Sequence, residues 1–494
     1  MYQTISGSNQ NLPDTSAFVQ TIDHLADYLP ELGQPLFRSN AEVIIARAPG
    51  RLDLMGGIAD YSGSLVLQLP IASATHVALQ LQAEPVLRIV SLPNALPEGG
   101  ARPRIFEMPL SEFAAAGKPV QYEVARARFS GTGMHHWAAY IAGALLVLMR
   151  ERAIEFNQGA HILVSSDVPE GAGVSSSAAL EVATMQALMV ACEIETDARQ
   201  LALLCQKVEN LVAGAPCGVM DQMTASCGED GELLVLLCQP DELWGTVKLP
   251  EELEVWGIDS GIRHSVGGGG YGRVRTAAFM GYRIIADEAG LDCRETNTPG
   301  KVQIVDQRFG GYLANILPEE FELRYAAHLP ESMNGKEFLE LYQGITDAVT
   351  VVEPDLNYPV LTATRHPIYE HARVKVFLET LQHWRGGDQI GLLGELMYRS
   401  HLSYSSCGLG SQGTDTLVSL VRQAPNSAGL YGAKITGGGS GGTVAVLGRR
   451  GVRDSVNLVA GKYQEETGLK PRVVAGSSAG AGRFGYLRII DTQI

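Results

Sequence analysis

The sequence predicts a mixed α+β fold with a large buried core. The chain has 494 residues, of which 45% are hydrophobic and 19% are charged, as is typical of globular proteins. Strand-like and helix-like segments follow one another irregularly, which argues against the regular alternation of a doubly wound sheet. Three separate glycine-rich elements lie among these segments. A chain of this length allows about two to four domains, and its core needs no disulfide bonds.

The first half of the chain contains most of the expected strands. After a polar first dozen residues, apolar residues at helical spacing predict a helix over 16–32, with Ser16 as its N-cap. Residues 92–105 are rich in proline and glycine and are expected to form a loop. Alternating or continuous apolar runs predict strands over 42–46, 64–70, 75–80, 86–91 and 159–165.

Helices and strands are mixed in the rest of the chain. The apolar run 137–149 is too short to cross about 30 Å of hydrocarbon, so it predicts a buried helix. A change of domain is expected near 228–231. Further helices are expected over 175–192, 198–213, 276–289 and 371–383, and strands over 233–237, 253–259 and on both sides of a glycine run within 429–451.

Charge and cysteine content narrow the possible partners. A net charge of −16 argues against a nucleic-acid partner, because neutralising phosphates requires clustered lysine and arginine. The N-terminal sequence lacks the basic and apolar regions of a signal peptide. The seven cysteines include no C-x-x-C pair, so they are expected to be reduced thiols rather than zinc ligands. These features favour a cytoplasmic protein without a membrane partner.

The second glycine-rich element, PEGAGVSSSAALE from residue 169, is a candidate phosphate-binding loop. A strand ends before it, Gly171 and Gly173 allow the backbone to turn tightly, and three serines begin a helix. The free N–H groups and partial positive charge of a helix N-terminus favour phosphate. The alternative is a plain glycine turn with a serine N-cap. The sequence G-x-x-x-x-G-K-[ST] of a P-loop is absent from the chain.

The third glycine-rich element, GAKITGGGSGGTVAVL from residue 432, contains two misleading patterns. Residues 437–442 match G-x-G-x-x-G, but a strand-like run follows them where a dinucleotide-binding fold would have a helix. The same pattern at 408–413 follows a loop rather than a strand. Ser440 lies in G-x-S-x-G, but between two strands, which argues against the nucleophile of a hydrolase. A β-hairpin with a glycine-rich tip is the simpler interpretation.

Three charged residues are candidates for phosphoryl-transfer chemistry. Asp221 follows a segment, PCGVM, that is too broken for a helix, and it could accept a proton from a substrate hydroxyl. Arg51, at a Pro-Gly corner, could pair with this carboxylate and keep it ionised. Glu209, with a serine hydroxyl, would suit Mg²⁺, which prefers few protein oxygens plus phosphates. The alternatives are a turn aspartate and a solvated helical glutamate.

Taken together, these elements resemble the galactokinase branch of the GHMP kinase superfamily. APGRLDLMGGIADY at 48–61 is similar to its sugar-recognition signature, and the second and third glycine-rich elements are similar to its ATP motif and its third motif. The segments 257–275 and 396–415 are similar to family segments near the sugar. The resemblance extends from about residue 48 to residue 447.

The resemblance implies a two-lobed fold with the active site between the lobes. A ribosomal-S5-like lobe would cover 41–230, after an extension over 1–40. A ferredoxin-like lobe would cover 231–494, with an insertion near 301–360 and a C-terminal tail. The implied reaction is ATP-dependent phosphorylation of a sugar at its anomeric hydroxyl, with Mg²⁺. The partners would be ATP and a small sugar.

The resemblance also assigns roles to individual residues. It implies that Asp221 and Arg51 form the catalytic pair and that Ser177 and Glu209 hold the metal. Sugar contacts fall on Asp60, Gly218 and Tyr271. The phosphate loop comprises Gly171, Ala172, Gly173, Val174, Ser175, Ser176 and Ser177.

One departure from the family pattern points to the sugar. Galactokinases carry Glu-His before Thr-Asp-Tyr, whereas this chain has Gly57 and Ile58 before Ala59-Asp60-Tyr61. The polar pair that would bind the hydroxymethyl group of galactose is absent, and L-arabinopyranose lacks that group. The signature and the segment TRHPIYEHARVKVF at 364–377 also resemble the kinase part of plant L-arabinokinases.

L-Arabinose is therefore the expected substrate. The alternatives within the class are galactose, another pentose and a uronic acid, although no basic residue in the altered signature would meet a carboxylate. An alternative of another class is a non-catalytic sugar sensor, which should have lost part of the phosphate loop or the base. A decarboxylase of the superfamily is disfavoured by the sugar signature.

Overall fold

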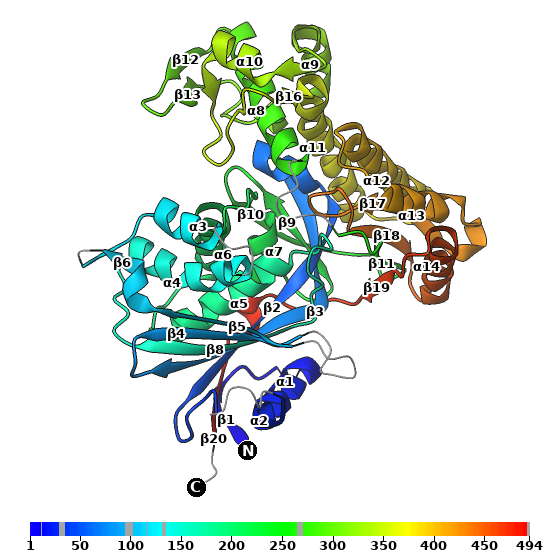
Figure 1. Cartoon of the computed structure of the whole chain (residues 1–494). Helices are drawn as coiled ribbons and strands as arrows, with labels where there is room; N and C mark the ends of the chain where they lie inside the picture. The colour runs from blue at the N-terminus through cyan, green and yellow to red at the C-terminus, as the bar shows by residue number, and fades with distance from the viewer. Residues whose placement is uncertain are drawn as a thin grey trace.

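The computed structural model describes residues 1–10, 12–28, 35–93, 102–115, 117–130, 135–263 and 270–491. Figure 1 shows a large sheet with helices at the lower left, a smaller sheet with helices at the right, and a mainly helical segment above both. Helices and sheets are both present in number, so the predicted mixed α+β class is confirmed. Among the described residues, no helix is both long and apolar enough to cross a membrane.

The large sheet has nine strands and includes both ends of the described chain. Its main order is β1-β20-β2-β3-β8-β4-β5, and β9 joins it by pairing with β3 and with β10. The pairing of β4 with β8 is parallel, and β2 with β3 is antiparallel over almost their whole length. The strands are β1 (Tyr2–Gly7), β2 (Val43–Met55), β3 (Leu65–Gln82), β4 (Val86–Ser91), β5 (Arg104–Pro109), β8 (Gly159–Ser166), β9 (Glu232–Leu237), β10 (Glu242–Lys248) and β20 (Leu487–Asp491).

Helices cover the large sheet on both faces. One face packs against an apolar cluster formed with the helices α4 (Ala139–Glu151), α5 (Ser176–Ala191), α6 (Ala198–Lys207) and α7 (Met220–Cys227), with α3 (Tyr122–Ser130) at its edge. The other face packs on α1 (Pro13–Asp23) and α2 (Leu25–Tyr28) through a second cluster that includes Phe18, Ile22 and Ile45. The two short strands β6 (Ala114–Ala115) and β7 (Lys118–Pro119) pair with each other.

The smaller sheet has four antiparallel strands in the order β17-β18-β11-β19. Its strands are β11 (Leu253–Asp259), β17 (Leu430–Ile435), β18 (Thr443–Arg449) and β19 (Arg472–Ala475). The helices α12 (Gln389–Ser406), α13 (Gln412–Gln423) and α14 (Arg453–Thr467) pack around it, as Figure 1 shows. The buried side chains Trp256, Val446 and Tyr463 belong to its core.

The upper segment lies between two long helices, α8 (Gly270–Glu288) and α11 (Val360–Gln382). Its core is continuous with Ile58 and Tyr61 of the signature and with Tyr404 of α12. The smaller elements are β12 (Asp292–Glu295), β13 (Gly300–Val305), α9 (Pro318–Arg324), β14 (Met333–Asn334), α10 (Gly335–Tyr342), β15 (Gly344–Ile345) and β16 (Asn357–Tyr358). The expected insertion therefore packs directly against the signature.

The predicted strands and helices are largely present, with several differences in extent. The strands expected over 64–70 and 75–80 form one strand, β3, and the strand expected over 42–46 continues through Arg51 as β2. The loop expected over 92–105 ends two residues early, since β5 begins at Arg104. Residues 29–32 of the first predicted helix, 94–101 of that loop and 264–269 of the segment 257–275 lie outside the described residues.

The tail after residue 451 returns to the large sheet. After α14 and β19, the short helix α15 (Ala481–Phe484) leads into β20, which pairs with β1 on one side and β2 on the other. The N-terminal extension and the C-terminal tail thus complete the same sheet, and Figure 1 shows both termini at its lower end. The domain boundaries expected at 40 and 230 stay predictions. All seven cysteines are free thiols, as expected.

Candidate active site

One cavity of about 350 Å³ lies where the two sheets and α8 meet. The signature contributes Arg51, Ile58 and Asp60 to its wall, and α8 contributes Tyr271. Asp221 and Glu209 line it from the helical face of the large sheet. The other expected residues in its wall are Gly171, Gly173, Ser175, Ser176, Ser177 and Gly218. Segments more than 200 residues apart in sequence therefore share one space.

The candidate phosphate loop runs from the end of β8 to the start of α5. Gly171 (φ +67°) and Gly173 (φ +71°) have left-handed backbone conformations, and so does Ser175 (φ +59°) just before the helix. The Ser175 hydroxyl is buried and has no hydrogen-bond partner among the described residues. Ala172 and Val174 do not line the cavity; their carbonyls accept hydrogen bonds from Thr443 Oγ1 (2.8 Å) and Arg51 N (3.1 Å). The loop is thus anchored on one side and open on the other.

The third glycine-rich element packs against the backbone of this loop at Ala172 and Gly173. It forms the turn between β17 and β18, which confirms the predicted β-hairpin. A Cβ atom on Gly437 would lie 2.6 Å from the Gly173 carbonyl oxygen, and one on Gly442 would lie 2.7 Å from that of Ala172. The glycines are therefore needed for the close approach of two backbones. Ser440 has a left-handed conformation (φ +60°) within the turn.

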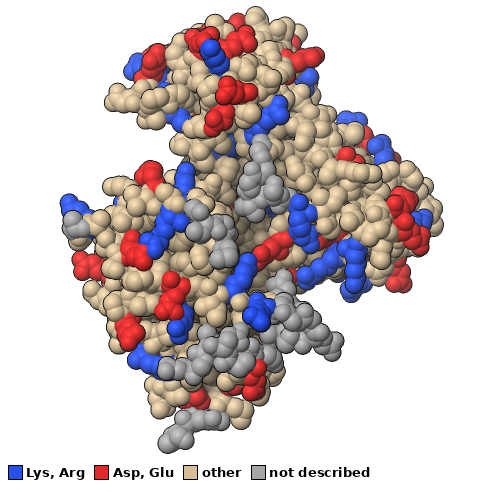
Figure 2. All heavy atoms as spheres, in the orientation of Figure 1, with Lys and Arg blue, Asp and Glu red and all other residues tan. Residues whose placement is uncertain are grey.

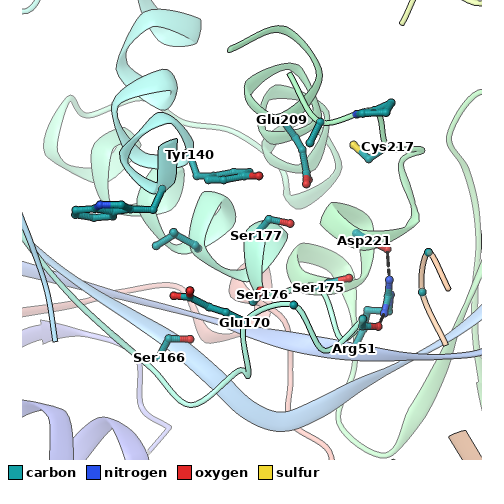
Figure 3. A pocket seen from close by; sticks show the side chains of 18 of the residues that line it. Arg51, Tyr140, Ser166, Glu170, Ser175, Ser176, Ser177, Glu209, Cys217 and Asp221 are labelled. Carbon is teal, nitrogen blue, oxygen red and sulfur yellow. Dashed lines mark hydrogen bonds and ion pairs between the residues drawn. The ribbon is translucent and has the colours of Figure 1, made fainter. Parts of the chain in front are cut away.

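Arg51 and Asp221 form an ion pair at the centre of the cavity. Arg51 Nε and Nη2 donate to Asp221 Oδ1 at 3.0 and 2.8 Å, and Nη1 donates to the Gly173 carbonyl at 2.6 Å. Figure 3 shows this pair beside the three serines. The arginine side chain is only 2% exposed, whereas that of Asp221 is 20% exposed. Both hydrogen bonds end on Oδ1 rather than on Oδ2.

The prediction that the segment around Asp221 is too broken for a helix is wrong in part. The break ends at Val219, and α7 begins at Met220, so Asp221 lies in the first turn of a helix. Met220 and Met223 are buried against the large sheet, and this packing stabilises a short helix that composition alone does not favour. The carboxylate therefore has a rigid support and lies near the partial positive charge of a helix N-terminus.

Glu209 faces the candidate phosphate loop from the opposite wall. It lies in a single π-helical turn, Val208–Ala213, a feature that often marks functional sites. Figure 3 shows Glu209 and Ser177 directed toward the same space. Gln222 Nε2 donates to Glu209 Oε2 (2.6 Å) and to Glu181 Oε2 (3.1 Å). Burial, and next the charge of Asp221, raise the pKa of Glu209 to about 7, while Ser177 acts in the opposite direction.

Ser177 and Glu209 fit a magnesium ion that they would hold jointly with a nucleotide. No group of three or more His, Cys, Asp or Glu side chains that could hold a metal occurs in the described part of the chain. One carboxylate and one hydroxyl suffice for Mg²⁺ when phosphate oxygens and waters complete its shell. Burial raises the pKa of the Glu209 carboxyl, no salt bridge joins it to a cationic side chain among the described residues, and a cation would favour its ionised form.

Asp60 is a buried acid that faces the end of the cavity opposite the candidate phosphate loop. It lies in the 3₁₀ turn Gly57–Ser62, is 4% exposed, and its Oδ1 has no hydrogen-bond partner among the described residues. Burial, and next the charge of Asp221, raise its pKa to about 7, and Arg275 acts in the opposite direction. A Cβ atom on Gly218 would lie 1.8 Å from Asp60 Oδ2, so only glycine fits there. Tyr271 completes this wall, edge-on to Tyr61.

Gly57 lies behind the cavity wall rather than in it. Its backbone is left-handed (φ +46°), and an added Cβ atom would lie 1.5 Å from the hydroxyl of Tyr404. The same hydroxyl accepts a hydrogen bond from Ile58 N (2.8 Å) and donates to the Gly437 carbonyl (3.2 Å). Tyr404 is fully buried and thus joins the signature to the glycine turn. Ile58 itself presents an apolar side chain to the cavity.

A buried ion pair that sequence reasoning missed supports the signature. Lys434 Nζ donates to Asp53 Oδ2, and both side chains are fully buried. Asp53 Oδ1 accepts hydrogen bonds from Gly57 N (2.9 Å) and Gln68 Nε2 (2.7 Å). The pair joins the two sheets directly beneath the turn that carries Asp60. The charged residue Lys434 within an otherwise apolar strand was the available signal.

The chain resembles known proteins along almost all of its length. Family models match it over 139–229 (GHMP kinases N terminal domain), 34–81 (galactokinase galactose-binding signature) and 380–456 (GHMP kinases C terminal). It is 30% identical to a galactokinase of Chloroflexus aggregans over 89% of this chain and 92% of that protein. The chain belongs to the GHMP kinases, in the galactokinase branch.

Two further comparisons place this GHMP kinase among its relatives. It is 44% identical to the L-arabinokinase of Arabidopsis thaliana over 99% of its own length, and it spans about half (52%) of that protein. Its structure matches that of Lactococcus lactis galactokinase complexed with galactose, with a TM-score of 0.68 at 21% identity over 93% and 99% of the two chains. The structural match shows the shared two-lobed fold.

Sequence reasoning about this kinase missed the far end of the cavity. Beyond the phosphate loop, the wall is formed by Leu92, Trp137, Tyr140, Ile141 and Val164. The guanidinium of Arg104 lies 5.0 Å from the centre of the Trp137 ring and pairs with Glu170. The run WAAYIAGALL was correctly predicted as a buried helix. Its first turn, however, also faces the cavity, which an apolar run alone does not reveal.

Proposed function

We propose that this protein is an ATP-dependent sugar 1-kinase that phosphorylates the anomeric hydroxyl of L-arabinose. The observation that carries this proposal is the shared cavity, in which the Arg51–Asp221 pair lies between the Asp60 wall and the loop 171–177. A sugar at the first wall and a triphosphate at the second would meet at this pair.

The nucleotide would lie along the cavity from Trp137 to the N-terminus of α5. The apolar wall suits a purine base, and the N–H groups of the glycine loop and the first helical turn suit phosphates. Ser177 and Glu209 would hold Mg²⁺ together with phosphate oxygens. When bound, the ion neutralises charge that develops on the transferred phosphoryl group.

Asp221 and Arg51 would act on the attacking hydroxyl. The Asp221 carboxylate is fixed by the helix and by the guanidinium, so it can orient the anomeric hydroxyl and take up its proton. The positive charge of Arg51 offsets negative charge on both the oxygen and the phosphoryl group. Asp60 Oδ1, buried and without a partner in the described chain, would accept a hydrogen bond from a ring hydroxyl.

The sugar preference rests on the wall around Ile58. An aliphatic side chain there offers no partner for an exocyclic hydroxymethyl group, so a buried hydroxyl would lose its hydrogen bonds. The high identity to a protein named L-arabinokinase supports the same sugar. The second candidate is galactose, because the galactose-binding signature model matches residues 34–81.

Measuring ADP release in the presence of free sugars tests this function. The purified chain with ATP and Mg²⁺ should release ADP most efficiently with L-arabinose, and the Asp221→Ala variant should release almost none. A higher kcat/KM for galactose would overturn the choice of sugar but not the kinase. Absence of sugar-dependent ADP from the intact chain would instead favour a sugar-sensing protein.

A further inference from the structure

The upper segment places one buried carboxylate behind the wall at the sugar end of the cavity, where it holds Arg275. Asp347 accepts hydrogen bonds from Arg275 Nε and Nη2, both at 2.8 Å, in a bidentate ion pair. The two side chains are only 3% and 7% exposed. Figure 2 shows exposed charges of both signs scattered over one face of the molecule. The Asp347–Arg275 pair lies beneath the surface and is not one of these exposed charges. A bidentate pair of this kind fixes both the position and the plane of the guanidinium.

Asp347 is itself held rigidly within the upper segment. Its carboxylate accepts hydrogen bonds from Thr350 Oγ1 (2.7 Å), Thr350 N (3.1 Å) and Val349 N (3.2 Å). Lys301 Nζ donates to the carbonyls of Asp347 and Thr350. The strand β15, just before Asp347, pairs in parallel with β13. The carboxylate thus belongs to a small closed turn that the upper segment builds around it.

The other side of Arg275 contacts the sugar end of the cavity. Its Nη1 donates to the Cys217 carbonyl at 2.9 Å, and its guanidinium lies 5.5 Å from the centre of the Tyr61 ring. Cys217 precedes Gly218, whose backbone packs on the Asp60 carboxyl so closely that no Cβ atom would fit. One guanidinium therefore fixes both the backbone in front of Asp60 and the aromatic side chain behind it.

Arg275 is also the principal cation acting on Asp60. Its charge opposes the effects of burial and of Asp221 on the pKa of Asp60. Arg275 follows Tyr271 by one helical turn on α8, so the two side chains project from the same side of that helix. Neither Arg275 nor Asp347 lines the cavity. Their effect on a bound sugar would act through Gly218, Tyr61, Tyr271 and Asp60.

We propose that Asp347 and Arg275 are a positioning pair for the sugar site, and that the upper segment thereby sets the affinity for the sugar. This inference rests on the proposed function, because it assigns the Asp60 end of the cavity to the sugar. The segment between α8 and α11 then contributes to sugar binding. It supplies the anion that holds Arg275 against the Cys217–Gly218 backbone. A lysine would not replace Arg275, since it cannot make both contacts in one plane.

The steady-state kinetics of variants test this proposal. Asp347→Asn keeps the shape of the side chain but removes its charge, and Thr350→Val removes one hydrogen bond to it. The Asp347→Asn variant should raise the KM for L-arabinose about tenfold, the equivalent of about one lost charge-assisted hydrogen bond, with little change in kcat or in the KM for ATP. Thr350→Val should raise it less, and Arg275→Lys should behave like Asp347→Asn.

Asp306→Asn is the matched control. Asp306 lies in the same segment and accepts hydrogen bonds from Tyr282 Oη (2.6 Å) and Phe309 N (2.8 Å), and none of these residues lines the cavity. This control should keep the wild-type KM for the sugar even if it lowers the melting temperature. Asp347→Glu, which retains the charge, should recover part of the sugar affinity that Asp347→Asn loses.

Two results would overturn the proposal. An unchanged sugar KM in Asp347→Asn, Arg275→Lys and Thr350→Val would reduce the pair to a structural contact. So would a parallel loss of kcat and of ATP affinity that follows the melting temperature. If Asp347→Asn fails to fold, Thr350→Val and Arg275→Lys decide. If the wild-type chain and the Asp306→Asn control both fail to release ADP with every sugar, the proposed function fails, and this inference fails with it.

Discussion

The two ends of the cavity are built by different means. The candidate phosphate loop presents mainly its backbone, with left-handed glycines followed by the start of α5. The sugar end depends on buried charged side chains, namely Asp60, Arg275 and Asp347, with Asp53 and Lys434 beneath them. The phosphate end is local in sequence, whereas the sugar end combines residues from four distant segments.

This difference agrees with the ligands that we propose for the two ends. Phosphate groups carry full charges, so unpaired N–H groups and a helix N-terminus bind them without buried counter-charges. A neutral sugar offers only hydroxyl groups, and directional recognition requires acceptors that are desolvated in advance. The burial that makes Asp60 a strong acceptor also raises its pKa. The positive charge of Arg275, which pairs with Asp347, acts against that rise. Variants at the two ends should therefore behave differently.

The largest expected effect lies between the two ends. Asp221→Asn keeps the size of the side chain but removes the proton acceptor, so kcat should fall about a thousandfold. The KM values for both substrates should change little, because neither binding surface is altered. Initial rates of ADP release would measure this. A kcat within about tenfold of wild type would show that the carboxylate only positions the hydroxyl.

The next effect should be confined to the phosphate end. Gly173→Ala introduces a side chain at φ +71° and places a Cβ atom 2.9 Å from the Thr436 carbonyl oxygen. The KM for ATP should rise about tenfold or more, because the left-handed strain and the displaced loop both weaken phosphate binding. Gly451→Ala is the control, since it has a similar φ (+84°) and nothing within 4 Å. An increase in the KM for the sugar instead would show that the two ends are not separable.

A third prediction concerns the packing behind the sugar end. Gly57→Ala places a Cβ atom 1.5 Å from the Tyr404 hydroxyl, so it should lower the free energy of unfolding by about 2 kcal/mol or more. Adding Tyr404→Phe removes the clashing oxygen and should restore part of this loss. Denaturant unfolding of the two single variants and the double variant gives the coupling energy. Strictly additive changes would contradict the close contact.

A fourth prediction is a pH dependence of sugar binding. The pKa of Asp60 is raised to about 7, so the protein without ligand progressively loses its ionised acceptor as the pH falls through 7. The Kd for L-arabinose, measured calorimetrically without nucleotide, should rise toward tenfold per pH unit below that value. Asp60→Asn should bind weakly and without this dependence. A constant Kd between pH 5 and 8 in the wild type would exclude Asp60 as the titrating acceptor.

The raised pKa of Asp60 also makes stability depend on pH. Sugar binding should strengthen as the pH rises, whereas the stability of the unliganded protein should fall. Because the pKa of Asp60 is higher in the folded protein than in the unfolded chain, the folded protein retains a proton that the unfolded chain has released between about pH 4 and 7. The contribution of Asp60 to the free energy of unfolding therefore falls as the pH rises through that window. The unliganded Asp60→Asn variant should gain stability relative to wild type at pH 8 compared with pH 4. Thermal unfolding at both pH values measures this.

The sequence was sufficient to predict the general class of the fold and the glycine turn that leads into α5; the binding of phosphate there stays a prediction. Glycines, serines and the flanking apolar periodicity of residues 169–181 are adjacent in the chain, so local rules apply to them. The helix that carries Asp221 was missed because the packing of Met220 and Met223 on the sheet, rather than local propensity, stabilises it.

The support of the sugar end could not be predicted from local patterns. Arg275 and Asp347 are 72 residues apart, and Ile58 and Tyr404 are 346 apart, so their contacts exist only in the folded chain. An aspartate just after a two-residue strand and a tyrosine on a helix give no sign of such partners. The lysine in the otherwise apolar strand β17 was a visible irregularity, but its partner Asp53 lies on the other sheet.

The most direct test of the shared cavity is phosphorus NMR of a reaction with ATP, Mg²⁺ and L-arabinose. The geometry predicts a new phosphate resonance coupled to the anomeric proton of the sugar, in an amount equal to the ADP formed, and its absence with Asp221→Asn. ADP without any sugar phosphate, or a phosphate coupled to a proton other than the anomeric one, would contradict the placement of the sugar between Asp60 and Asp221.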